Sequence, residues 1–215
     1  MSVLRRRLPF LMATCLTLLP PAIAQAQPKE PTPTPTLLAE VRRSFTLDGE
    51  RIPPEIFRDF GDGNLADSTP IWVTIDLRAA VGSNFYADDI TQNGDWIIQR
   101  KATPDVMNGR QEAAYKYLGA TENGLLLVLA TYNSGGSGNF TTLHLLGLDA
   151  QPAFDSEGAV YERLNLTNLR SLILGDRWEG EISIAKNMVR VVTTREGPAD
   201  RSGTRREMSF EARRP

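Results

Sequence analysis

The chain has 215 residues, enough for one domain with a sizeable hydrophobic core. Its 26 acidic and 24 basic residues leave a formal net charge of −2, which argues against a nucleic-acid or anionic-lipid surface as partner. One cysteine and one histidine exclude a disulfide framework and any metal site that needs several thiolates or imidazoles.

The first 26 residues are predicted to be a secretory signal peptide. Three arginines, Arg5–Arg7, precede an apolar run from Leu8 to Leu19. Ala24 and Ala26 then supply small residues at the −3 and −1 positions of a signal-peptidase site. The apolar run of about 12 residues is shorter than the ~20 that a membrane-spanning helix requires. We therefore expect a bacterial protein exported to the periplasm or the extracellular space.

Cleavage after Ala26 removes Cys15 and the three arginines. The mature chain then has 21 basic and 26 acidic residues, a net charge of −5. It has no transmembrane segment and no thiol, so it is expected to fold by core burial alone. Its first residues, 27–36, alternate proline and threonine over Pro28–Thr36, which predicts an extended spacer or a disordered start.

Residues 37–215 are predicted to form a single domain that begins with a short helix and continues as strands. Pro53 and Pro54 precede an apolar pair, Ile56 and Phe60, spaced four residues apart, which indicates one or two helical turns. From Ile71 to Leu77 apolar and polar residues alternate, as in a half-buried strand.

The remaining strands follow at intervals of roughly 10–15 residues, with no long amphipathic helix between them. They are expected at Asp95–Lys101, Ala114–Leu118, Leu125–Thr131, Thr141–Leu148, Ala159–Leu164, Leu169–Leu174, Glu181–Ala185, Met188–Thr194 and Glu207–Ala212. This pattern predicts an all-β fold, an antiparallel, jelly-roll-like β-sandwich of nine or ten strands with one short N-terminal helix. The continuously apolar run Leu125–Thr131 is typical of a central strand covered on both faces.

Five residues are candidates for ligand binding. His144 lies within a predicted strand, where a structural histidine bonded to a neighbour is the alternative. Asn133, Ser137 and Asn139 belong to a glycine-rich loop that could approach a sugar or a partner closely, or could simply connect two strands. Trp72 should point outward if the alternating residues Ile71, Val73 and Ile75 face the core.

No catalytic motif emerges, and no cofactor is predicted. Ser183 and Lys186 have the Ser-x-x-Lys spacing, but they lie in a predicted strand and turn instead of one helical turn. Calcium is conceivable at two loops rich in Asp and Asn, 59–67 and 89–94, although ordinary turns explain both. The second loop lacks the Glu that closes an EF-hand, because Arg100 occupies that position.

Three functions follow as hypotheses. The first is an exported, non-catalytic binding or cell-envelope-associated protein, whose partner would be a carbohydrate or another envelope protein. The second is a carbohydrate-active hydrolase with two carboxylates facing each other across a groove. The third is a calcium-dependent, lectin-like sugar binder.

Overall fold

The computed structural model describes residues 34–60, 72–82, 89–102, 110–195 and 205–214. All of them belong to one compact unit, Thr32–Pro215. The predicted signal peptide, the predicted cleavage site and residues 27–33 of the predicted spacer lie outside the described residues. None of the described helices is both long and apolar enough to cross a bilayer.

The first element is helix α1, Thr34–Ser44, so the prediction of an extended spacer is wrong for residues 34–36. Pro35 occupies the first turn, where a helix needs no backbone N–H donor, and therefore starts the helix instead of preventing it. Leu37 and Val41, four residues apart, form its buried face.

Two short strands and a second helix follow. Strands β1 (Thr46–Leu47) and β2 (Glu50–Arg51) form a two-residue hairpin whose central residues, Asp48 and Gly49, both have positive φ. The Glu40 carboxylate of α1 accepts hydrogen bonds from the Thr46 hydroxyl and from the backbone N–H groups of Asp48 and Gly49.

Helix α2, Ile56–Asp59, confirms the helix expected after Pro53 and Pro54. Ile56 and Phe60 are both buried, as their spacing predicted. Beyond it, strand β3 covers only Thr74–Asp76 of the strand predicted over Ile71–Leu77, because the chain turns at Leu77 into helix α3, Leu77–Gly82.

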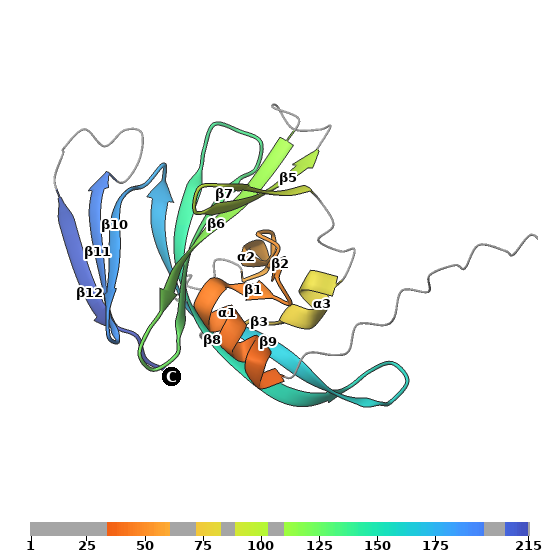
Figure 1. Ribbon diagram of the computed structural model, residues 1–215. Helices are drawn as coiled ribbons and strands as arrows, with labels where there is room; N and C mark the ends of the chain where they lie inside the picture. The colour runs from red at the N-terminus through yellow and green to blue at the C-terminus, as the bar shows by residue number, and fades with distance from the viewer. Residues whose placement is uncertain (1–33, 61–71, 83–88, 103–109, 196–204, 215) are drawn as a thin grey trace, which may run out of the picture. The chain divides into compact units, whose positions relative to one another are not determined.

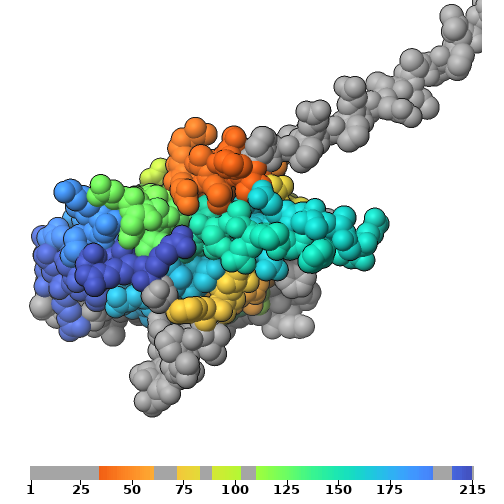
Figure 2. All heavy atoms as spheres, turned by 90° about the horizontal axis from the view of Figure 1, so that it is seen from below, coloured from red at the N-terminus to blue at the C-terminus, as the bar shows by residue number. Residues whose placement is uncertain are grey.

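Seven strands form one antiparallel sheet in the order β3-β9-β8-β7-β6-β5-β4 (Figure 1). Besides β3, these are β4 (Asp89–Asn93), β5 (Trp96–Ala102), β6 (Arg110–Ala120), β7 (Leu126–Asn133), β8 (Phe140–Phe154) and β9 (Val160–Asp176). Strand β9 joins the two strands predicted at Ala159–Leu164 and Leu169–Leu174. Its hairpin with β8 extends beyond the helices, as the teal segment in Figure 2 shows.

A second, three-stranded sheet has the order β10-β11-β12. Its strands are β10 (Glu179–Ala185), β11 (Met188–Arg195) and β12 (Arg206–Glu211), close to the predicted bounds. Val189 and Val191 of this sheet pack with Leu125, Leu127 and Leu129 from the β7 region of the large sheet. The two sheets thus share one core, as in a sandwich.

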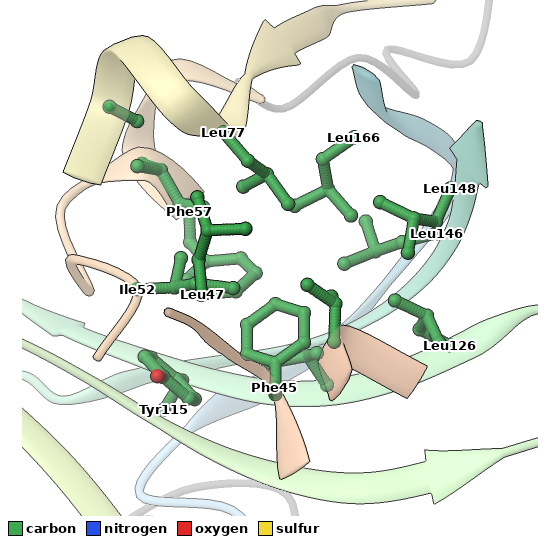
Figure 3. Close-up of a cluster of buried hydrophobic side chains, with 14 of the residues drawn as sticks. Phe45, Leu47, Ile52, Phe57, Leu77, Tyr115, Leu126, Leu146, Leu148 and Leu166 are labelled. Atoms are coloured by element: carbon green, nitrogen blue, oxygen red, sulfur yellow. The ribbon is translucent and has the colours of Figure 1, made fainter. Parts of the chain in front are cut away.

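The opposite face of the large sheet carries a second core (Figure 3). Leu126 and Leu146 of the sheet point toward Phe45, which follows α1, and toward Phe57 of α2. We call this the helical face. Strand β7 is buried on both sides, because its alternate residues enter the two cores.

The antiparallel β class predicted from the sequence is confirmed. The described residues form twelve strands and three helices, more of each than expected. Strands β4 to β9 follow one another as a meander, so the order differs from the crossed connections of a jelly roll.

Candidate functional site: a cavity on the helical face

A cavity of about 470 Å³ lies between α2 and the helical face of the large sheet. This volume is in the range of small-molecule sites. Its described lining comes from the α2 segment and from strands β6 to β9. It consists of Pro54, Phe57, Arg58, Ala113, Ala130, Thr131, Tyr132, Phe140, Thr142, His144, Ser171 and Ile173.

Small side chains create this space. Ala113 of β6, Ala130 of β7, Thr142 of β8 and Ser171 of β9 all line the cavity, and Ala130 and Thr142 are direct cross-strand partners. One row further along, Val128 and Leu126 occupy the equivalent alternate positions on β7 and pack into the core. The change from Leu and Val to Ala along one strand face therefore converts a filled interior into an open one.

His144 lies at the buried end of the cavity and is 3% exposed. Its Nδ1 is 3.0 Å from the Ser171 Oγ, which accepts a hydrogen bond of 2.8 Å from the Asn168 side-chain amide. The rings of Phe57 and Phe60 pack against the imidazole, with centroids at 5.3 and 5.8 Å. The histidine is thus a neutral polar group enclosed by aromatic rings on one side.

Burial lowers the pKa of His144 to about 4, and the nearby Asn168 amide opposes this only in part. The imidazole is therefore uncharged at neutral pH. The contacts differ from those of a catalytic triad, because Asn168 interacts with both the imidazole and the serine, whereas the orienting group of a triad contacts only the histidine. The cluster satisfies the serine hydroxyl and the Asn168 amide N–H, whereas the Asn168 Oδ1 is buried with no hydrogen-bond partner in the described part of the chain.

Arg58 supplies the charge at the mouth of the cavity. Its guanidinium lies over the Tyr132 ring, 4.7 Å from the centroid, and its Nη1 is 2.7 Å from the Glu55 carboxylate. A much smaller adjoining pocket is lined by Arg58, Glu55 and Lys101. Among the described residues that line the main cavity, Arg58 is the only one with a formal charge.

The rim is apolar and open to solvent. Phe140 and Ile173 line the cavity, yet each is 56% exposed. Exposed aromatic and branched side chains beside a cavity are typical of a surface that a ligand covers.

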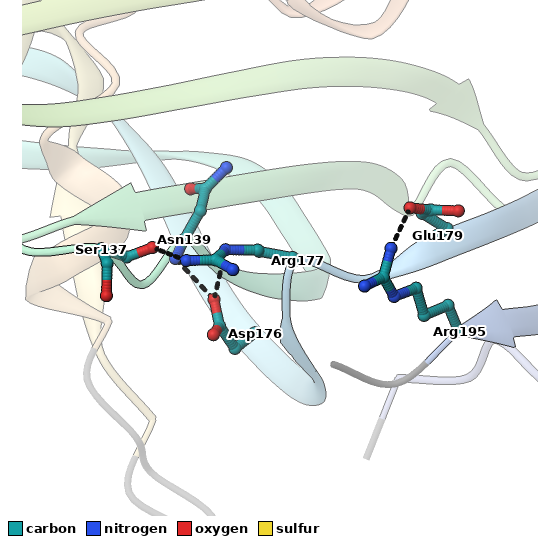
Figure 4. A network of polar contacts seen from close by, with 6 residues as sticks. All are labelled: Ser137, Asn139, Asp176, Arg177, Glu179 and Arg195. Carbon is teal, nitrogen blue, oxygen red and sulfur yellow. Dashed lines mark hydrogen bonds and ion pairs between the residues drawn. The ribbon is translucent and has the colours of Figure 1, made fainter. Parts of the chain in front are cut away.

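The predicted loop residues lie beside this rim, not in the described lining. Asn133 caps the turn by accepting a hydrogen bond from the Gly135 N–H. The Ser137 carbonyl accepts from Arg177, and the Asn139 N–H donates to Asp176 at 2.7 Å (Figure 4). These contacts tie the loop to the end of β9, next to Phe140.

Of the five residues predicted for binding, the structure places His144 in the cavity. Trp72 is 55% exposed while Val73 and Ile75 pack against the core, so its outward orientation is confirmed. It precedes β3, away from the cavity's described lining.

Sequence reasoning missed Arg58 and Ser171. Finding them requires the strand register, which pairs Ala130 with Thr142 and His144 with Ser171. A single sequence does not reveal this register. In the described part of the chain no group of three or more His, Cys, Asp or Glu could hold a metal ion. Residues 61–67 of one proposed calcium loop lie outside it, and the other loop is the β4–β5 hairpin.

No protein-family model, curated protein or solved structure matches this chain.

Proposed function

We propose that this chain is an exported protein that binds a small, mostly apolar molecule in the cavity on the helical face. The N-terminal signal-peptide pattern supports export. The cavity supports binding: it is of small-molecule size, it is lined mainly by apolar groups, and it ends at one buried polar cluster formed by His144, Ser171 and Asn168.

The single observation that carries the proposal is the row of small side chains beneath the exposed rim. Ala113, Ala130 and Thr142 stand where larger residues would fill the space, so the sheet leaves an apolar volume open beside Phe140. Open apolar volume costs stability, on the order of 1 kcal/mol for each missing methyl-sized group, and a ligand would recover that packing.

The hydrolase alternative has less support at this site. It requires two carboxylates facing each other, whereas the charged residue in the described lining is an arginine. Binding of an apolar molecule, by contrast, needs only the lining that the cavity provides.

Replacing Thr142 by Phe tests the proposal. Thr142 lines the cavity and is partly exposed, so the new ring would occupy the binding volume without entering the packed core. We expect the wild-type protein to bind the neutral fluorophore N-phenyl-1-naphthylamine saturably. The Thr142→Phe variant should bind it at least tenfold more weakly.

Thr91→Phe is the matched control, because Thr91 lies exposed on strand β4 and outside the described lining. It should bind the fluorophore as the wild type does. Equal binding by Thr142→Phe and wild type, with both variants folded by circular dichroism, would show that the dye does not enter this cavity. Lack of saturable binding to the wild type would overturn the proposal.

A further inference from the structure

We infer that the ligand of this cavity carries a carboxylate at one end of an apolar body, and that Arg58 binds that carboxylate. The inference rests on the proposed function and names the chemical class of its ligand. It follows from the position and the contacts of one cation.

Charge is unevenly distributed around the cavity. The described lining of the cavity contains one formally charged residue, Arg58, and no carboxylate. His144 at the buried end is neutral at neutral pH. Arg58 and Lys101 both pair with Glu55, so this group of three keeps one net positive charge. A ligand inside therefore meets apolar walls along its length and a guanidinium of this group at one point, which favours a single negative group placed there.

The guanidinium of Arg58 is held in place and keeps donors to spare. One nitrogen, Nη1, bonds Glu55, and the Tyr132 ring supports the plane of the guanidinium from one side. A guanidinium has five N–H donors, and in the described part of the chain the side chain of Arg58 donates only this one hydrogen bond. Its remaining donors match the two oxygens of a carboxylate in a forked arrangement.

Arg58 and His144 differ in their depth in the cavity. The arginine side chain is 38% exposed at the mouth, while His144 is almost fully buried. The polar end of the ligand would therefore remain near solvent beside Arg58. The apolar body would contact Phe57 and Ala130 and extend toward the uncharged buried end at His144. A linear molecule of fatty-acid type has this division.

The experiment compares three molecules with the same ten-carbon chain: decanoate, decanol and decyltrimethylammonium. Each displaces N-phenyl-1-naphthylamine from the full-length mature protein at neutral pH and low ionic strength. We expect decanoate to bind at least tenfold more tightly than decanol, and the cationic molecule to bind most weakly. Arg58→Gln should lower decanoate affinity to that of decanol and leave decanol unchanged.

Arg100→Gln is the matched control, since Arg100 is also paired with a carboxylate, Glu112 at 2.8 Å, but lies outside the described lining. It should change none of the affinities. Equal affinity for decanoate and decanol, or an equal loss of both in Arg58→Gln, would overturn the inference while leaving apolar binding intact. Failure of the dye itself to bind would instead overturn the proposed function.

Discussion

Burial dominates the chemistry of His144, the only histidine in the chain. Its pKa of about 4 lies below the usual value of 6.5 because the charged form would lose its hydration among aromatic rings. The neutral form can bond Ser171 without that loss. The apolar surroundings of this residue therefore favour its neutral form over its charged form.

This environment predicts a specific dependence of stability on pH. Between pH 6.5 and 4 this histidine is protonated in the unfolded chain but remains neutral in the folded chain. The contribution of His144 to the free energy of unfolding is therefore fully present above pH 6.5 and decreases as the pH falls toward 4. We expect a loss of about 3 kcal/mol in the free energy of unfolding over this range.

Urea unfolding at several pH values, compared between wild type and His144→Gln, measures this effect. The variant should lack this part of the pH dependence, so the difference between the two proteins should shrink as the pH falls. The imidazole signal of the wild type in NMR spectra should not titrate between pH 7.5 and 5. A midpoint near 6.5 would show that the ring is solvated.

At the scale of elements, local sequence patterns located most strands because they report alternation and turns. The Asn93-Gly94 pair marked the β4–β5 hairpin, and the apolar run at Leu125–Thr131 marked a strand buried on both faces. Helix α1 was missed because prolines near its start suggested an extended chain. The β1–β2 hairpin was missed although Asp48-Gly49 is a recognisable turn signal.

The cavity was not predictable in the same way. Nothing in the sequence distinguishes Ala130 or Ser171 from other small residues. The register between β7, β8 and β9 is what places these small side chains around one cavity. Arg58 joins them because α2 packs on that face, which is a tertiary contact. His144 could be selected as a candidate from its chemistry, but its partners could not.

The start of strand β10 depends on the absence of one side chain. A Cβ at Gly180 would lie 2.1 Å from the Val192 carbonyl oxygen and 2.4 Å from the Trp178 ring. The backbone register also shifts between Glu179 and Gly180. We expect Gly180→Ala to lower the free energy of unfolding by about 1–3 kcal/mol, because the strand and the tryptophan must separate.

Chemical denaturation of Gly180→Ala beside Gly82→Ala measures this cost. Gly82 ends helix α3 with nothing within 4 Å of its Cβ position, so its replacement should be neutral or slightly stabilising. A neutral Gly180→Ala would mean that β10 does not approach β11 this closely.

For the whole molecule, the large sheet is the middle layer of three. The helices and the β1–β2 hairpin cover one face, and the three-stranded sheet covers the other. Adjacent residues of β7 pack in different cores. Leu126 belongs to the core on the helical face, and Leu127 belongs to the core on the opposite face; both are fully buried. One strand therefore links the stability of the two outer layers.

This linkage predicts a single unfolding transition. Leu126→Ala and Leu127→Ala should each cost about 2–5 kcal/mol. Both should shift the far-ultraviolet dichroism and the tryptophan fluorescence together, although Trp96 and Trp178 pack only against the core of Leu127. A Leu126→Ala variant whose fluorescence transition stays at the wild-type midpoint would show that the layers unfold separately.

The order of the layers along the chain has a consequence for how the protein is made. Helix α1, Thr34–Ser44, is synthesised before every strand of the large sheet, whose side chains bury Leu37 and Val41. Strand β3 likewise waits for β9, its pairing partner about 90 residues later. The apolar face of α1 therefore stays without its partners until the later strands are present, so chains truncated before β9 should expose it and aggregate.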